Sequence, residues 1–131
     1  MTWISLVLAD DNVAILRDLR DELRDEFAIS GTAENGEDAT RAVLHLDPDV
    51  LVLDITMPIL NGLEVASQLR QRHSRTKILF LSIHEESEYI LAGFSAGASG
   101  CVTKRRLVSD LATGIHEVFE GRLFLSPTLK R

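Results

Sequence analysis

The chain alternates between short apolar runs and longer stretches in which apolar residues recur every three or four positions. Short apolar runs are typical of strands that are buried on both faces of a sheet. The predicted strands span residues 3–9, 28–33, 50–54, 77–82 and 100–104. The run VLVLD is the most apolar of them. It ends in an aspartate, which is unusual because an unpaired buried carboxylate is costly.

Helical spacing follows these runs. Four stripes of apolar residues at helical spacing predict four helices. The stripes consist of Leu16, Leu19 and Leu23; of Ala39, Val43 and Leu46; of Leu63, Ala66 and Leu69; and of Val108, Leu111, Ile115 and Val118. A fifth, short helix is predicted over residues 85–98, which end in glycines as helices often do. The second helix is expected to end at Asp47, because a residue before proline avoids the α region. Gly121 is expected to end the last helix.

The alternation of strands and helices predicts an α/β fold in which helices cover both faces of a parallel sheet. Right-handed crossovers then place the carboxyl ends of all strands at one edge, where folds of this kind bind ligands. The 131 residues are enough for one domain with a hydrophobic core. We expect that domain to span residues 1–121, and residues 122–131 (RLFLSPTLKR) to begin a linker to a further domain.

Composition narrows the classes of partner. A net charge of −6 argues against nucleic-acid binding by this chain alone, because phosphate neutralisation needs a basic face. The single cysteine, Cys101, excludes an intrachain disulfide and favours a reducing compartment. The amino terminus lacks the basic residues of a signal peptide, and no apolar run approaches the roughly 20 residues that span a bilayer. We therefore expect a cytoplasmic location.

Polar residues occur where the predicted strands end. Asp10 and Asp11 follow the first strand, Asp54 ends the third, Ser82 ends the fourth and Lys104 ends the fifth. These side chains should meet at one edge of the sheet. Crowded carboxylates repel one another, and Mg²⁺ relieves such repulsion with carboxylate oxygens and water as its ligands. A carboxylate can also act as a nucleophile and form an aspartyl phosphate, whose oxygens an ammonium and a hydroxyl would stabilise.

The acid pair DD at 10–11, DITMPILNG at 54–62, LS at 81–82 and TK at 103–104 together resemble the receiver domain of two-component response regulators. The resemblance implies a flavodoxin-like sheet of order 2-1-3-4-5. It also implies that Asp54 accepts phosphate from a histidine kinase, with Ser82 and Lys104 contacting the new phosphoryl group. Asp10, Asp11, Asp54 and the Thr56 carbonyl would hold Mg²⁺. The chain itself would then be a switch and not an enzyme, apart from its own phosphorylation and dephosphorylation.

LSIH at 81–84 and GASGCVTK at 97–104 resemble the subgroup whose receivers are joined to a LuxR/NarL-type DNA-binding domain. That subgroup implies regulation of transcription through such a domain. We also expect a homodimer on phosphorylation, with Val108, Ala112 and Ile115 or their neighbours as apolar contacts. Two positions depart from the family. Cys101 stands where an aromatic residue is common, and Arg105 replaces a common proline, so a trans peptide bond is expected there.

Other interpretations stay open at this point. A haloacid-dehalogenase-like phosphatase also uses a strand-end aspartate, but it needs a second acid where Thr56 stands. A receiver-shaped interaction module that works without phosphorylation is the other alternative. One of the two acids at 10–11 could partly cap the first helix, and His84 could control the access of water to the site. Trp3 and Phe80 are expected in the core, and Cys101 is expected to be buried and unreactive.

Overall fold

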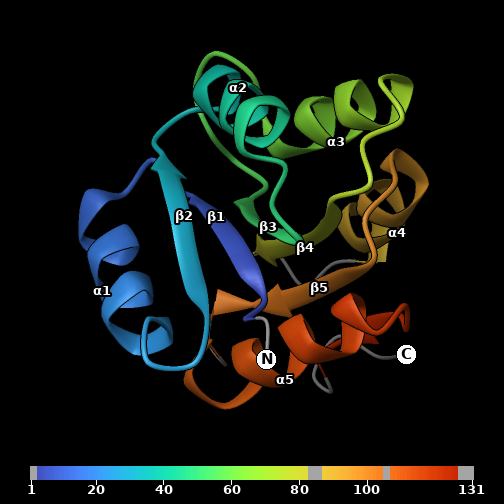
Figure 1. The fold of residues 1–131 in the computed structure, drawn as a ribbon. Coiled ribbons are helices and arrows are strands. Elements are labelled where there is room, and N and C mark those ends of the chain that lie inside the picture. The colour runs from blue at the N-terminus through green and yellow to red at the C-terminus, as the bar shows by residue number, and fades with distance from the viewer. Residues whose placement is uncertain (1–2, 83–86, 105–106, 127–131) are drawn as a thin grey trace.

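A parallel β-sheet lies at the centre of the computed structural model, and helices cover both of its faces (Figure 1). The structure describes residues 3–82, 87–104 and 107–126, and of residues 87–90 and 107–109 only the backbone. The strands are β1 (Ser5–Ala9), β2 (Ala28–Ala33), β3 (Val50–Asp54), β4 (Lys77–Ser82), β5 (Gly100–Thr103) and β6 (Phe124–Leu125). The helices are α1 (Val13–Leu23), α2 (Gly36–Leu46), α3 (Gly62–Gln71), α4 (Ser87–Ala96) and α5 (Leu107–Phe119).

The strand order is β2-β1-β3-β4-β5-β6, and every neighbouring pair is parallel. The predicted fold class and the order 2-1-3-4-5 are confirmed. The sheet has one strand more than the sequence predicted, because Phe124 and Leu125 pair with Gly100 and Cys101 of β5. Two residues are too few to show a period, so the hydrophobic pattern does not reveal β6. The sheet therefore extends into the segment that the sequence assigns to a linker.

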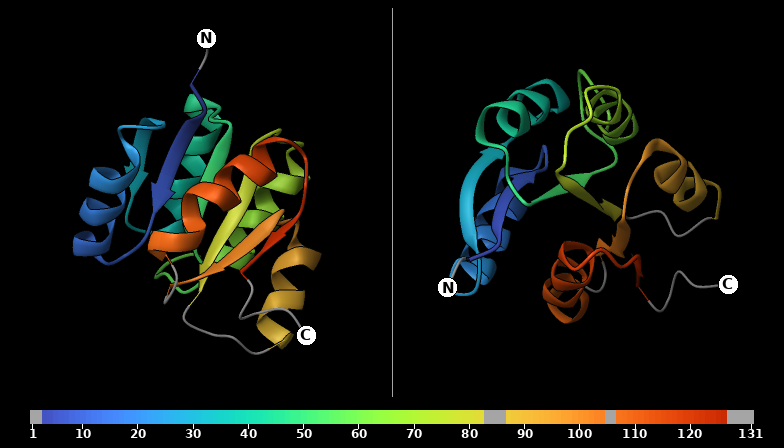
Figure 2. Two further views of the ribbon diagram at one scale, coloured as in Figure 1. Left: turned by 90° about the horizontal axis from the view of Figure 1, so that it is seen from below. Right: turned by 45° about the vertical axis from the view of Figure 1, so that its right-hand side comes forward.

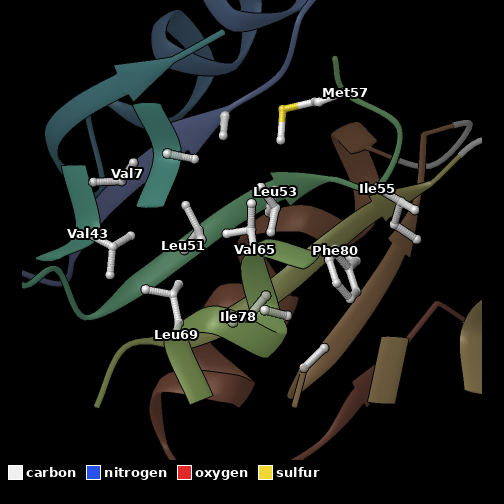
Figure 3. Close-up of a cluster of buried hydrophobic side chains, with 14 of the residues drawn as sticks. Val7, Val43, Leu51, Leu53, Ile55, Met57, Val65, Leu69, Ile78 and Phe80 are labelled. Atoms are coloured by element: carbon white, nitrogen blue, oxygen red, sulfur yellow. The ribbon is translucent and has the colours of Figure 1, made fainter. Parts of the chain in front are cut away.

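The inner strands send alternate side chains into two apolar layers. Val7, Leu51 and Leu53 belong to the layer beneath α2, α3 and α4 (Figure 3). Leu6 and Leu8 belong to the layer on the other face, which α1 and α5 cover. The two groups of helices lie on opposite sides of the sheet (Figures 1 and 2). All five residues of β3 are buried, so this central strand carries its last residue, Asp54, into a site enclosed by its neighbours.

Asparagine side chains cap three of the helices that follow strands. Asn12 accepts hydrogen bonds from the backbone N–H groups of Ala14 and Ile15 at the start of α1. Asn35 caps α2, and Asn61 caps α3 in a capping box with Glu64. The suggestion that Asp10 or Asp11 caps the first helix is therefore wrong, because Asn12 takes that role. At the other end of α2, Asp47 adopts a left-handed conformation (φ 49°), and the helix ends there as predicted.

The ring of Phe80 lies between glycines of two helices. A Cβ atom on Gly62, at the start of α3, would lie 3.1 Å from the ring, and one on Gly93 of α4 would lie 2.8 Å from it. Both contacts are closer than ordinary side-chain packing. Phe80 is 1% exposed, which confirms that it belongs to the core. The aromatic ring thus packs against the backbone of both α3 and α4.

Two expectations about apolar residues are wrong. Trp3 precedes β1 and is 51% exposed, so it is not a core residue. Ile115 is fully buried against the sheet by α5, so it cannot supply a dimer contact on the surface. Cys101 is buried as predicted, and burial raises the pKa of its thiol to about 12, which leaves it unreactive. The predictions on His84, Arg105 and the side chain of Val108 lie outside the described residues.

The amino terminus of α2 touches the loop that follows β3. A Cβ atom on Gly36 would lie 1.8 Å from the backbone oxygen of Leu60, a distance that neither backbone can accommodate without moving. Glycine at this position therefore allows α2 to support the loop that leads away from Asp54.

We expect Gly36→Ala to lower the free energy of unfolding by about 1–3 kcal/mol, the usual cost of overpacking. Helix propensity alone predicts the opposite sign, a gain of up to about 1 kcal/mol. Urea unfolding followed by circular dichroism measures the difference. Glu37→Ala, at the next and exposed position, is the control. A Gly36→Ala protein as stable as the wild type would show that helix and loop are not in tight contact.

Candidate functional site

The five predicted side chains come from four strands that end at one edge of the sheet. Asp10 and Asp11 follow β1, Asp54 ends β3, Ser82 ends β4 and Lys104 follows β5. The parallel register pairs Asp54 with Leu81 and Ser82 with Thr103, which brings the ends of β3, β4 and β5 level with one another. The predicted grouping at the carboxyl edge therefore follows directly from the strand order.

Three carboxylates lie close together at this edge. One oxygen each of Asp10, Asp11 and Asp54 lies within 4.8 Å of the others. Asp10 and Asp54 are buried, whereas Asp11 is exposed and lies at the entrance. Such an arrangement concentrates negative charge where water is largely excluded, so it needs a cationic partner.

Backbone hydrogen bonds hold the two buried carboxylates in the same way. The N–H of Asn12 donates to Oδ1 of Asp10 over 2.9 Å. The N–H of Thr56 donates to Oδ1 of Asp54 over 3.3 Å. In each case the donor is two residues beyond the acid, and the second oxygen, Oδ2, is left to face the centre of the site. Asn12 thus has two roles, since its side chain also caps α1.

Lys104 lies between the two buried acids. Its Nζ is 2.9 Å from Oδ2 of Asp10 and 3.4 Å from Oδ2 of Asp54, and its side chain is only 16% exposed. One ammonium therefore serves two carboxylates, and with Asp11 the group keeps a formal surplus of two negative charges (three minus one). Apart from this ion pair, buried Oδ2 of Asp10 accepts no hydrogen bond from any residue in the described part of the chain.

The pKa of Asp54 is raised to about 6, first because the carboxyl is buried and second because Asp10 is close. The charge of Lys104 and the hydrogen bond from Thr56 act in the opposite direction but do not compensate. Burial acts to lower the pKa of Lys104, but its hydrogen bond to Asp10 and the charges of both acids outweigh burial and raise it. Lys104 is therefore a fixed cation, while Asp54 is a carboxyl whose negative charge is only partly neutralised.

The donor set fits a hard divalent cation. Carboxylate oxygens are the protein ligands that Mg²⁺ prefers, usually one or two of them together with water. The three grouped oxygens, the surplus negative charge and the buried Oδ2 of Asp10 would all be satisfied by such an ion. Thr56 is exposed in the loop after β3, beside the carboxylate to which its N–H donates.

The loop after Asp54 is packed tightly on one side and open on the other. A Cβ atom on Gly62 would lie 2.6 Å from the backbone oxygen of Asp54, so glycine is needed for close approach and not merely for a turn. Met57 is buried in the apolar layer (Figure 3). Ile59 is 73% exposed and has a φ of 71°, a conformation that β-branched residues rarely adopt.

Sequence reasoning identified the charged residues of the site but missed Asn12. Its signal was present, because asparagine directly before a helical period is a common amino-terminal cap. The contact of its backbone with Asp10 has no sequence signal, since any residue but proline offers an N–H group.

Comparison with known proteins agrees with this geometry. The family model described as response regulator receiver domain matches residues 6–116. The chain is 34% identical over 128 residues to the uncharacterized transcriptional regulatory protein YvfU of Bacillus subtilis, covering 96% of the chain and 64% of that protein. It is 28% identical over 127 residues to the nitrate/nitrite response regulator protein NarL of Escherichia coli, covering 95% of the chain and 59% of that protein.

Solved structures have the same fold. A two-component response regulator of the LuxR family from Aurantimonas sp. SI85-9A1 superposes with a TM-score of 0.92 at 30% identity, over 98% of the chain and 93% of that structure. The signal receiver domain of a response regulator NarL from Mycobacterium tuberculosis superposes with a TM-score of 0.90 at 24% identity, over 93% of the chain and 100% of that structure. At this level of identity, the match shows a shared fold and no more. Within the described ranges, no helix combines the length and apolar character that crossing a membrane requires.

The raised pKa of Asp54 predicts a pH-dependent stability in the absence of metal. The folded protein binds the proton of Asp54 more tightly than the unfolded chain does, so this group's contribution to the unfolding free energy falls as pH rises from about 4 to about 6. The loss is at most about 3 kcal/mol, and Asp54→Asn should avoid it. Urea unfolding in the presence of a chelator at pH 4 and pH 7 measures this. The free energy of unfolding of Asp54→Asn, relative to that of the wild type, should be higher at pH 7 than at pH 4. Parallel pH profiles for the two proteins would contradict this.

Proposed function

The chain belongs to the family of response regulator receiver domains, and from that membership we propose that Asp54 is its phosphoacceptor. Receiver domains are phosphorylation-controlled switches of two-component signalling, and they interact with histidine kinases. The observation that carries the assignment is the position of Asp54, which shares Lys104 with Asp10 at the carboxyl edge of the sheet. We propose a sensor histidine kinase as the phosphodonor.

In the proposed reaction, a carboxylate oxygen of Asp54 attacks the phosphorus of a phosphohistidine. A P–O bond forms as the P–N bond breaks, and the electron pair of that bond returns to the imidazole nitrogen. The product is an acyl phosphate on Asp54. Attack on the phosphorus by water later breaks the same P–O bond, restores the carboxylate and releases the group as inorganic phosphate. Because Asp54 must be ionised to attack, its pKa of about 6 allows the reaction at neutral pH.

Lys104 and Ser82 are proposed to contact the transferred group. A phosphoryl group adds about 1.5 to 2 negative charges at pH 7, and Lys104 is already within ion-pair distance of Asp54. Ser82 is buried at the end of the adjacent strand, where its hydroxyl can donate to a phosphoryl oxygen. Most of the catalysis in phosphoryl transfer is positioning and neutralisation of charge, and these residues supply both.

Receiver domains bind Mg²⁺ in an acidic pocket, and we propose that Asp10, Asp11, Asp54 and the Thr56 carbonyl hold it here. When bound, the ion would neutralise the carboxylates and the incoming phosphoryl oxygens. The buried Oδ2 of Asp10 supports this assignment, since its only cationic contact in the described residues is the shared Lys104.

Phosphorylation would change the partners of Lys104 and Ser82. A phosphoryl group on Asp54 competes with Asp10 for the ammonium of Lys104, and it draws the hydroxyl of Ser82 inward. We propose that these two changes alter the surface formed by α4, β5 and α5, as expected of a two-state switch. A homodimer of the phosphorylated protein remains part of the proposal, without Ile115 as a contact.

The output is proposed from the relatives. YvfU is a transcriptional regulatory protein and NarL a response regulator protein, and the chain spans only about 53–64% of the length of the first such relatives. We propose that this receiver regulates transcription through a DNA-binding domain that follows it, with residues 122–131 leading to that domain. The net charge of −6 supports the view that this chain does not bind DNA by itself. The cytoplasmic location stays a prediction.

Two other functions are less well supported. A haloacid-dehalogenase-like phosphatase would need an acid in place of Thr56, and receivers of transcriptional regulators are generally not enzymes. An interaction module that works without phosphorylation does not need the buried acids and Lys104 in one cluster. Steady turnover of a phosphate ester would favour the phosphatase, and a protein that is never labelled would favour the interaction module.

Asp54→Asn should abolish labelling by acetyl phosphate in the presence of Mg²⁺, because an amide cannot form the acyl phosphate. Intact-protein mass spectrometry measures the added phosphoryl group. Asp38→Asn, which changes an exposed acid of α2, is the matched control and should be labelled like the wild type. Labelling of Asp54→Asn at the wild-type level would defeat the assignment.

Mg²⁺ should raise the melting temperature of the wild type, because it neutralises carboxylates that repel one another. In Asp11→Asn, the Mg²⁺ concentration required for the same rise in melting temperature should be at least about tenfold higher, which corresponds to about 1.4 kcal/mol. Differential scanning fluorimetry with an extrinsic dye is the measurement, since Trp3 lies at the opposite end of β1 from the site. The exposed Asp25→Asn is the control. Equal Mg²⁺ dependence of both variants would exclude Asp11 as a ligand.

A further inference from the structure

The segment after α5 is held against the receiver beside the strand that carries Lys104. Phe124 and Leu125 form β6 and pair with Gly100 and Cys101. The N–H of Phe124 donates to the carbonyl of Ser99 over 3.0 Å, and the N–H of Ser126 donates to the carbonyl of Cys101 over 3.1 Å. This short strand therefore covers the outer edge of β5.

Side chains on both faces reinforce the docking of β6. The Phe124 ring fits against α5 where Gly114 leaves space, since a Cβ atom there would lie 3.0 Å from the ring. Leu125 packs against the apolar layer that contains Cys101, its partner in the register. The small side chain of Cys101 thus has a leucine from β6 beside it. Phe124 and Leu125 thus pack against the two apolar layers on opposite faces of the sheet.

Ser126 connects this docked segment to the site. It is fully buried, and its hydroxyl oxygen accepts a hydrogen bond from the backbone N–H of Thr103 over 3.2 Å. Thr103 directly precedes Lys104, whose ammonium lies between Asp10 and Asp54. The hydroxyl of Ser126 therefore holds the peptide between Val102 and Thr103, one residue before the backbone of Lys104.

We propose that Ser126 is a positioning residue for Lys104, and that docking of β6 is coupled to the phosphorylated state of the site. This inference rests on the proposed function and adds a specific regulatory link to it. When β6 is docked, the backbone at Thr103 is fixed and Lys104 is ready to meet a phosphoryl group. When β6 detaches, Thr103 loses this acceptor and Lys104 is less well placed. Docking and phosphorylation then favour each other.

Coupling of this kind is reciprocal. If a phosphoryl analogue on Asp54 tightens the docking of β6 by some factor, then the protein with β6 undocked must bind that analogue more weakly by the same factor than the protein with β6 docked. The two effects can be measured independently, one at the site and the other at the amides of β5 and β6. A residue with a merely structural role would change stability without producing this pair of effects.

The test uses beryllofluoride with Mg²⁺ as the phosphoryl analogue on the 131-residue chain. In the wild type, the amides of Thr103, Phe124 and Ser126 should exchange hydrogen more slowly once beryllofluoride is bound. Ser126→Ala should weaken beryllofluoride binding at least about fivefold, the lower end of typical coupling between sites. Phe124→Leu, which reduces the contact with Gly114, is a second variant and should shift binding in the same direction.

Two controls separate coupling from loss of stability. Leu123→Ala changes the residue before β6, which is 73% exposed, and should bind beryllofluoride like the wild type. Leu19→Ala removes a buried contact of α1 and should lower stability while leaving the affinity of the folded protein unchanged. Wild-type affinity in Ser126→Ala, or unchanged exchange at the three amides, would overturn the inference. A wild type that bound no beryllofluoride would overturn the proposed function as well, which distinguishes the two failures.

Discussion

Repulsion among carboxylates at the carboxyl edge of the sheet is the constraint on which the rest of the site depends. Asp10 and Asp54 are buried within reach of one ammonium, that of Lys104, and Asp11 adds a third negative charge at the entrance. Burial and the charge of Asp10 raise the pKa of Asp54. A cation that enters a site with this surplus of negative charge therefore stabilises it. A new anionic group beside Asp54 would compete with both acids for Lys104.

The fold brings these charges together by holding the backbone of the strand ends and of the loops that follow them in fixed positions. The parallel register sets the ends of β3, β4 and β5 side by side. Asn12 caps α1, so neither Asp10 nor Asp11 is needed as the cap of that helix. Backbone N–H groups of Asn12 and Thr56 each hold one oxygen of a buried carboxylate. The apolar strands therefore supply rigidity, and the loops after them supply orientation.

The helix positions and the charged residues of the site could be predicted, because each leaves a periodic or positional signal along the chain. The strand order was predicted from the family resemblance and not from periodicity. Features that depend on contacts between distant segments could not. β6 is too short to show a period, and Ser126 gives no sign of its bond to Thr103. Apolar character alone misplaced Trp3, which lies before β1 and remains exposed. Ile115 faces the sheet as its helical stripe predicted, so only its expected role as a dimer contact was wrong. Whether an apolar residue faces the sheet or solvent depends on where its element begins and how it packs.

The position of Phe80 between Gly62 and Gly93 has a mechanical consequence. The ring touches the backbone where α3 begins, beside the peptide of Asp54, and also the middle of α4. Because aromatic rings are rigid and glycine has no side chain that could move aside, a shift of α4 toward this ring would press the ring against the start of α3. A larger residue at 93 would have to be accompanied by a smaller one at 80. Gly62 has no such freedom, because the backbone oxygen of Asp54 lies too close to it whatever residue stands at 80.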